Sequence, residues 1–396
     1  MTNRWRALAR TFGFWIGFFW VARLLFLWYH RSLTAALPSG DFVRIFWHGF
    51  RLDASGAAYL SAVPAALLVL STFPPLLVGC RRLFRLWMAA TIVLGSILIV
   101  ADLEIFRHWD RRVDGTLVGY LRTPAEAVAS TGGTPRAALT LVALALAATA
   151  LVCWHRMVWP QWQRLEPVHP AWSMPGLLMV AVLVIPARGG IQVIPVTRSS
   201  AYFSANPFAS AAAENGLWTF FDSLVRGLGN QTNPYRIMSP DSAAAAVSDA
   251  ATPLNSPQPS PLTSSRPNVL LIIWESASAR AIGTLGGLAE VPPRFDALSK
   301  EGLLFRQFFA AGDRTDKGLT AILSGFPGLP RGSVMKVPSK AARLPKLGSD
   351  FGAAGYQTSF YYGGELEFAS LQAYLVQSGF ARLVGKEDFP SSSWNS

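Results

Sequence analysis

Cysteine and histidine are scarce in this chain, and their positions exclude two kinds of site. Its 396 residues include only Cys80 and Cys153, which lie at the ends of apolar runs without the spacing of a zinc site or a disulfide framework. All five histidines precede residue 170. A metal site later in the chain would therefore have to rely on oxygen ligands.

Charged residues are also few, at 15% of the chain, whereas hydrophobic residues make up 51%. The apolar residues form long runs before residue 190 and fall to ordinary globular density after it. The net charge is +12, but many arginines flank the apolar runs as membrane-surface anchors do, and no nucleic-acid motif accompanies them. We predict a membrane module followed by a water-exposed module, with no nucleic-acid partner.

Five apolar runs are each near the roughly 20 residues that a bilayer-spanning helix requires. They cover residues 12–29, 54–78, 86–106, 137–154 and 172–187. No signal-peptide cleavage pattern follows the first run, so we expect a retained span. Arg23 interrupts this run, and we expect it to snorkel or to face the bundle rather than to contact a headgroup.

Arginines set the expected orientation of these spans. They cluster before the first span, between the second and third, and between the fourth and fifth, so the positive-inside rule places these three segments in the cytoplasm. Five spans then place the second half of the chain outside. One loop disagrees with the rule, because Arg107, Arg111, Arg112 and Arg122 fall on the predicted outer side.

The segments between these modules have distinct compositions. Residues 41–53 mix aromatic and charged side chains and predict an interfacial stretch, in which Arg51 and Asp53 act as membrane-surface anchors rather than as substrate guides. Residues 188–228 are aromatic, which indicates a segment along the bilayer or under the outer domain. A helix over 241–250 and a flexible tether over 252–266 follow. The expected domains are residues 1–190, 191–265 and 266–396.

The last of these domains alternates apolar runs with helix-like segments. Strands are predicted at residues 269–274, 303–309 and 358–362, and helices at residues 294–301, 318–323 and 367–377. This alternation is typical of a parallel α/β sheet.

Two residues of this domain form a candidate site. Glu275 follows the strand predicted at 269–274, and open α/β sheets bind ligands at the carboxyl ends of such strands. Thr315 precedes a predicted helix, whose N-terminus would favour an anion. A carboxylate beside a hydroxyl suggests a metal-activated nucleophile. The alternatives are a solvated strand end for Glu275 and a helix N-cap for Thr315, while Arg314 and Lys317 are candidates for phosphate contact or plain loop charges.

Four sequence blocks resemble a known superfamily. PNVLLIIWES resembles the first strand of the alkaline phosphatase–sulfatase superfamily. RFDALSKEGLLFRQFFAAGDRTDKGLTAILSGFPGLP, FYYGGELEF and GFARLVGKEDFP resemble its lipoteichoic acid synthase and bacterial membrane phosphoglycerol transferase branch. The five-span module also fits that branch. The resemblance implies a multi-pass helical domain in the bacterial cytoplasmic (inner) membrane, followed by an extracytoplasmic α/β domain of the alkaline phosphatase type.

The resemblance also implies an activity. In that branch a divalent metal, Mn²⁺ or Mg²⁺, is held partly by the residue at Glu275, and the nucleophile falls on Thr315. The nucleophile attacks the phosphorus of phosphatidylglycerol, releases diacylglycerol and passes phosphoglycerol to a glycan or polyglycerophosphate acceptor. The downstream Asp-His pair and Trp-Gly motif of the branch do not occur here. We therefore expect an incomplete catalytic domain with two oxygen ligands and impaired activity.

Three other functions stay open. A phosphoethanolamine transferase is disfavoured because the outer half has no cysteines, in which such enzymes tend to be rich. A sulfatase that hydrolyses sulfuric esters is disfavoured because residues 315–319 lack the C/S-x-P-x-R pattern of its nucleophile. A non-catalytic membrane protein that kept the front of the domain for binding would explain the missing histidines.

Overall fold

The structure is a computed structural model. It describes residues 2–115, 117–118, 135–227, 238–250, 264, 266–287, 293–329, 332–367, 370–390 and 392. The chain divides into two compact units: Met1–Leu228 together with Ala311–Ser396, and Gly229–Ala310. The expected boundary at residue 266 differs from this division, because the contacts of residues 311–396 place them in the first unit.

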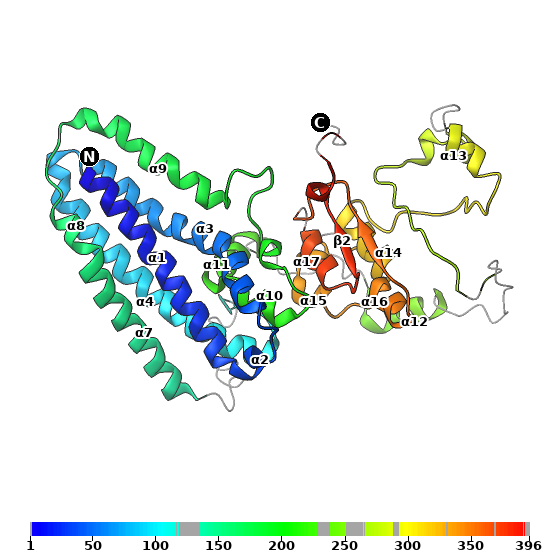
Figure 1. Ribbon diagram of the computed structural model, residues 1–396, viewed down its shortest axis with the longest axis horizontal. Coiled ribbons are helices and arrows are strands. Elements are labelled where there is room, and N and C mark those ends of the chain that lie inside the picture. The colour runs from blue at the N-terminus through cyan, green and yellow to red at the C-terminus, as the bar shows by residue number, and fades with distance from the viewer. Residues whose placement is uncertain are drawn as a thin grey trace. The chain divides into compact units, whose positions relative to one another are not determined.

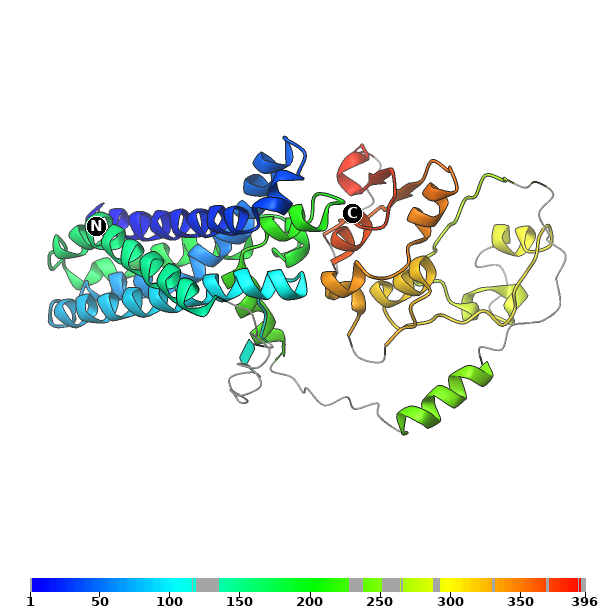
Figure 2. The same ribbon diagram turned by 90° about the horizontal axis from the view of Figure 1, so that it is seen from below.

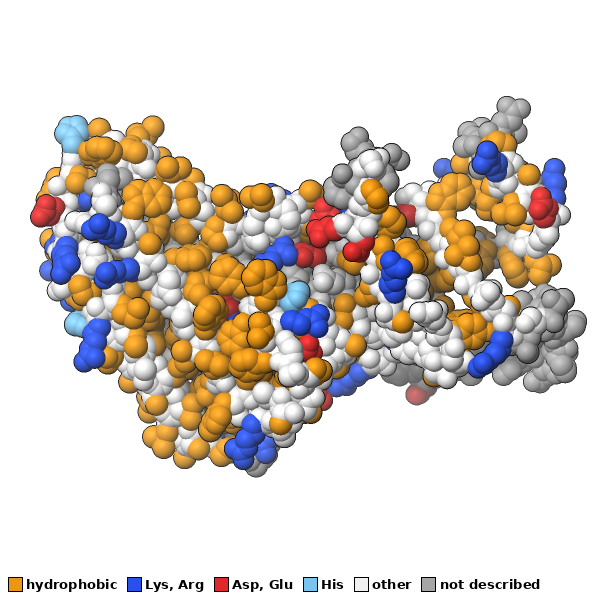
Figure 3. Space-filling model, in the orientation of Figure 1, with side chains coloured by type: hydrophobic (Ala, Val, Ile, Leu, Met, Phe, Trp, Pro, Cys, Tyr) orange, Lys and Arg blue, Asp and Glu red, His pale blue; other side chains and the backbone are white. Residues whose placement is uncertain are grey.

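Four described helices have the length and apolar composition of membrane spans (Figure 1). They are α1 (Thr2–Tyr29), α3 (Asp41–Leu70), α4 (Leu77–Trp109) and α7 (Arg136–Met157). Helix α1 packs against α3, and α4 packs against α7, as Figure 2 shows from below. Hydrophobic side chains cover much of the visible surface of this bundle (Figure 3), which suits contact with lipid.

The second predicted span had the wrong boundaries. Helix α3 begins at Asp41, so residues 41–53 are its first turns rather than a separate interfacial stretch. It ends at Leu70, eight residues before the predicted end, and Pro74 and Pro75 begin the 3₁₀ turn η1 (Pro74–Leu76). Proline disfavours a helical conformation in the residue before it and lacks the N–H that a continuous helix needs.

The fifth predicted span corresponds to a shorter helix. Helix α9 (Ser173–Arg188) has 16 residues, or about 24 Å at 1.5 Å per residue, which is less than the hydrocarbon thickness of about 30 Å. It packs along α3, where the Ser55 hydroxyl donates to Ala187 O at 2.7 Å. The span count of five therefore stays a prediction.

Large aromatic side chains form the bundle core. Trp15 and Phe18 meet edge to face at 5.5 Å between ring centroids, while Phe84 and Trp162 stack at 3.7 Å. Lipid tails are as apolar as these side chains, so helix association in a membrane depends on close packing rather than on removal from water. The stacked aromatic rings provide such packing over large areas.

Two helices after the fifth run also join the bundle. Helices α10 (Pro207–Ala213) and α11 (Gly216–Gly227) pack against α3, and α11 also contacts α4. Asn206 caps α10 by accepting a hydrogen bond from Phe208 N at 2.9 Å, and Pro207 occupies the first helical position, as proline often does. Residues 208–220 are buried, so this part of the aromatic segment lies inside the module rather than along a membrane surface.

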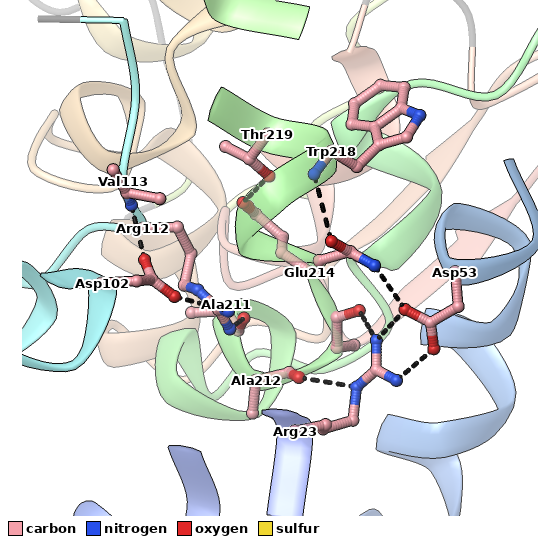
Figure 4. Close-up of polar contacts among 12 residues, drawn as sticks. Arg23, Asp53, Asp102, Arg112, Val113, Ala211, Ala212, Glu214, Trp218 and Thr219 are labelled. Atoms are coloured by element: carbon pink, nitrogen blue, oxygen red, sulfur yellow. Dashed lines mark hydrogen bonds and ion pairs between the residues drawn. The ribbon is translucent and has the colours of Figure 1, made fainter. Parts of the chain in front are cut away.

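A buried polar network joins these two helices to the bundle (Figure 4). Arg23 of α1 forms a bidentate ion pair with Asp53 of α3, and Asn215 donates to Asp53 Oδ1 at 2.9 Å. Arg112 pairs with Asp102 of α4 at 2.7 Å. Both arginines are more than nine-tenths buried. The expectation that Arg23 faces the bundle is therefore confirmed, and snorkelling is excluded by its burial.

Residues 311–396 contain the described strands. Helices α14 (Thr315–Ser324), α15 (Pro338–Ala341) and α16 (Leu347–Ala353) precede β1 (Ser359–Tyr361), α17 (Leu371–Val376) and β2 (Arg382–Val384). The two strands pair in parallel, with Phe360 opposite Leu383. The predicted strand at 358–362, the parallel direction and the helix after Thr315 are confirmed for this part of the chain.

Two other predicted strands are wrong for the described residues. Residues 269–274 and 303–309 form no ladder there, and Leu270 and Ile272 are 85% and 77% exposed rather than buried. An apolar run becomes a buried strand only with strands beside it and helices over its faces. The described part of this unit has no strand, and its helices leave Leu270 and Ile272 exposed. Helices α12 (Pro240–Ala250) and α13 (Pro293–Leu298) agree with two predicted helices, although α13 is shorter than expected.

Breaking the Arg23–Asp53 pair is expected to destabilise the bundle. The change Asp53→Ala leaves a buried guanidinium without its counter-ion, so we expect the free energy of unfolding to fall by about 3 kcal/mol. The double change Arg23→Met with Asp53→Leu is expected to cost less, because no lone charge stays buried. Unfolding in mixed detergent micelles, followed by tryptophan fluorescence, measures both. Arg6→Ala, at an exposed arginine of α1, is the control. An equal loss of unfolding free energy in Asp53→Ala and Arg6→Ala would contradict the assignment.

Candidate functional site

Thr315 is the first residue of helix α14 and is half-buried. The preceding residue, Arg314, has an extended backbone (φ −140°, ψ 150°), and its carbonyl accepts from the N–H groups of Lys317 and Gly318, each at 3.0 Å. Arg314 therefore occupies the N-cap position, so the alternative of Thr315 as N-cap does not hold. The hydroxyl lies in the first turn, where the helix dipole favours negative charge.

A small core holds α14 in place. Leu319 and Leu323, one and two turns after Thr315, are buried with Met335, Leu371 and Leu375. Residues four apart lie on one face of a helix, so Thr315 stands at the end of the face that this core anchors. The Ser324 hydroxyl and the Tyr374 hydroxyl lie 2.6 Å apart and connect α14 to α17.

Two glycines, one before and one after α14, make room for the loop that leads to Thr315. A Cβ atom at Gly328 would lie 1.9 Å from Ala311 O, and one at Gly312 would lie 2.6 Å from Lys317 Cβ. Neither distance is possible for a real side chain. The absence of side chains at these two positions allows the loop to pack closely beneath the first turn of α14.

The charged residues around Thr315 are arranged in pairs. Lys317 Nζ lies 2.6 Å from Asp313 Oδ1, and Lys336 Nζ lies 3.0 Å from Asp316 Oδ2. The hydrogen bond from Lys317 lowers the pKa of Asp313. Lys317 is buried and is therefore placed for its Asp313 contact, whereas Arg314 is exposed at the loop surface.

Glu275 lies in the other compact unit. It is exposed in a turn that follows residues 267–274, and the next residue, Ser276, has a left-handed backbone (φ 60°). The Ser278 side chain then caps the 3₁₀ turn η4 (Ala279–Ala281) through Arg280 N at 3.3 Å. Thr315 belongs to the first unit and Glu275 to the second, so their expected meeting stays a prediction.

The donor chemistry of these residues suits a hard cation. The carboxylate of Glu275 and the hydroxyl of Thr315 are oxygen donors of the kind that Mn²⁺ and Mg²⁺ prefer. Among the described residues, however, no group of three His, Cys, Asp or Glu side chains could hold a metal ion. A divalent ion normally takes about six ligands, so we assign no catalytic step to it.

The sequence interpretation missed a buried lysine in this part of the chain. Lys346, at the N-cap position of α16, is 4% exposed, and its amine lies 3.6 Å above the Tyr374 ring. Within the described residues the amine has no hydrogen-bond partner. Burial lowers its pKa to about 8. The sequence signal was its place between Pro345 and Leu347, but one lysine among apolar residues is weak evidence.

Burial of this lysine is expected to make local stability depend on pH. Below about pH 8 both the folded and unfolded chains hold the proton, and the folded chain bears the cost of a buried charge. Between pH 8 and the ordinary lysine value of 10.5 only the unfolded chain holds it, so stability rises with pH.

The change Lys346→Met removes that rise. At pH 7 we expect it to stabilise α17 by about 1–2 kcal/mol, less than the full shift because solvent reaches part of the site. Hydrogen–deuterium exchange of α17 peptides, compared with wild type at each pH, checks this. Lys340→Met, in the neighbouring helix α15, serves as the control. Equal effects of the Lys346 change at pH 7 and pH 10 would contradict the assignment.

Comparison with known proteins finds a match for the last third of the chain. Residues 267–396, about a third of the chain, match the family model described as Sulfatase. No solved structure matches the chain. Enzymes of this superfamily are generally dependent on a divalent metal. Residues 267–396 are therefore similar to the sulfatase family, which supports a place for this region in the alkaline phosphatase–sulfatase superfamily.

Proposed function

We propose that this protein is a membrane-bound transferase that moves a phosphoglycerol group from phosphatidylglycerol to a hydroxyl of a cell-envelope glycan or glycerophosphate polymer. The observation that carries the proposal is the position of Thr315, at the start of a core-anchored helix within a sulfatase-family domain. The long apolar helices support a lipid substrate. We place the protein in the bacterial cytoplasmic membrane, with this domain on the outer side.

The reaction proceeds in two displacements at phosphorus. Thr315 Oγ forms a bond to the headgroup phosphorus, and the bond from phosphorus to the diacylglycerol oxygen breaks. The proton lost by Thr315 balances the one that the diacylglycerol oxygen gains. An acceptor hydroxyl then attacks the same phosphorus, and Thr315 recovers its hydroxyl.

The residues around Thr315 suit this reaction. The first-turn N–H groups and the dipole of α14 favour the negative charge on the phosphoryl oxygens. Arg314 is exposed beside the hydroxyl and is our candidate for a phosphate contact, whereas Lys317 maintains the loop through Asp313. A bound Mn²⁺ or Mg²⁺, with Glu275 as one ligand, would lower the pKa of the Thr315 hydroxyl.

Three rival functions make different predictions about Thr315. A phosphoethanolamine transferase would carry a phosphoethanolamine adduct on this residue. A sulfatase would hydrolyse a sulfate ester, although residues 315–319 lack the expected nucleophile pattern. A non-catalytic protein would form no adduct with any lipid.

Incubation with lipid is expected to modify Thr315. With phosphatidylglycerol and Mn²⁺, peptide mass spectrometry of the full chain should find a glycerophosphoryl group on Thr315. Thr315→Val should lose this adduct, and Thr315→Ser should retain part of it because a hydroxyl remains. Thr358→Val, at a threonine that is half-buried like Thr315 and lies in the same matched region, is the matched control.

The mass of the adduct names the donor. An ethanolamine phosphate on Thr315 would replace the proposed donor, and an unmodified Thr315 with every lipid would end the transferase proposal. Turnover is expected to be slow, because no three-ligand metal group is found in the described residues. The adduct is therefore a more sensitive readout than product release.

Metal affinity is expected to be weak and to depend on two side chains. Isothermal titration of the purified chain with Mn²⁺ should give a dissociation constant of about 10⁻⁴ M or weaker, since two oxygen ligands leave most of the coordination to water. Glu275→Gln and Thr315→Val should each weaken it further, while Glu301→Gln, at another exposed carboxylate of the same unit as Glu275, should not. Micromolar affinity that survives Glu275→Gln would contradict the assigned ligand.

A further inference from the structure

A cavity of about 130 Å³ lies next to the buried polar network, and arginines dominate its polar lining. Four of them line it: Arg111, Arg112, Arg198 and Arg343. One ordered water needs roughly 10–15 Å³ of such space, so the cavity admits a group as large as a phosphate. The cavity beside the Arg23–Asp53 pair is only about 20 Å³ and has room for a single water.

The four arginines come from three separate segments of the first compact unit. Arg111 and Arg112 follow the end of α4, Arg198 opens the 3₁₀ turn η3 (Arg198–Ala201), and Arg343 follows α15. Four guanidinium groups and two carboxylates, Asp110 and Glu214, face the space. Asp102 and Asp114, behind the lining, balance the two remaining arginine charges, so converging N–H donors rather than net charge favour an anion here.

Three of the arginines are held from one side by a carboxylate. Arg112 pairs with Asp102 at 2.7 Å, and Arg111 pairs with Asp114 at 2.7 Å. Arg198 donates through Nε and Nη2 to Glu214 Oε2, at 3.2 and 2.9 Å. A guanidinium has five N–H donors, so one carboxylate leaves donors for a second anion. Figure 4 shows Arg112 between Asp102 and Ala211.

Two of the arginines, Arg112 and Arg343, have N–H groups available for an anion. Arg112 is 7% exposed, and in the described part of the chain its Nε–H has no partner although it is buried. Arg343 is exposed and has no carboxylate partner among the described residues. An arrangement in which fixed arginines surround a space with unused N–H groups is typical of sites for tetrahedral oxyanions, because guanidinium forks match phosphate oxygens.

We propose that this cavity binds a phosphate group, either the phosphodiester of a lipid headgroup or free phosphate. The site is separate from Thr315 and needs no chemical step. It goes beyond the transferase proposal, since a protein without transferase activity would still bind phosphate there. A comparison of phosphate with short-chain lipids, described below, decides whether the same cavity binds the headgroup of a lipid donor.

Titration calorimetry of the purified full chain in a neutral detergent tests the site. Inorganic phosphate is expected to bind saturably at constant ionic strength, where chloride gives no saturable signal. Arg343→Gln should weaken binding roughly tenfold, and Arg343→Lys should weaken it less. Arg82→Gln, at an exposed arginine near the opposite end of α4, should leave it unchanged.

The lipid arm compares three short-chain ligands below their micelle concentrations: dihexanoyl-phosphatidylglycerol, dihexanoyl-phosphatidylcholine and dihexanoylglycerol. Tighter binding of the phospholipids than of phosphate supports a headgroup site, and binding of phosphate alone supports a free-phosphate site. Equal binding of dihexanoylglycerol, equal effects of the Arg343 and Arg82 changes, or no saturable phosphate signal would overturn the proposal. The same titration with Thr315→Val should give wild-type affinity, which separates this result from the fate of the transferase proposal.

Discussion

Two buried ion pairs organise the membrane module, because a charge inside an apolar bundle has to be neutralised by a partner. Arg23 also donates to Ala212 O and Ala213 O, at 3.1 and 3.0 Å, and Arg112 donates to Ala211 O at 2.9 Å. These carbonyls are the last three of α10, where a helix runs out of its own N–H donors, although Ala211 O also accepts from Glu214 N at 3.1 Å. Two arginines thus stabilise the negative end of a short helix and fix it to α1, α3 and α4.

This arrangement explains which features of the membrane module could be predicted from the sequence. Long apolar runs are a local property, and four of them agree with helices of sufficient length. Residues 41–53 were expected to lie at an interface because they mix charged and aromatic side chains. In the structure the same residues begin α3, and Asp53 is buried against Arg23. Composition alone does not distinguish a surface charge from one that a distant helix neutralises.

The region that matches the sulfatase family model shows the same limit for strands. Residues 267–274 form no strand although their apolar run predicts one, because strand pairing depends on segments far along the chain. Strand β1 has its partner β2 about twenty residues away, across helix α17, so closing that loop costs little entropy. The helix after Thr315 was predictable for a similar reason, since α14 depends on local spacing and on Gly325, whose left-handed backbone ends it. The partner of Asp316, Lys336, lies twenty residues on and gave no signal.

The buried pairs also bear on the one loop that opposed the positive-inside rule. Arg107 contacts Glu104 at 3.4 Å, Arg111 contacts Asp114, and Arg112 is buried against Asp102; Arg122 lies outside the described residues. The rule concerns cations in loops that stay on one side of the membrane during insertion. Arg112 is part of the packed interior, where it supports α10 and lines the arginine-rich cavity. Its position is accounted for by packing, so it carries little weight as a marker of the cytoplasmic side.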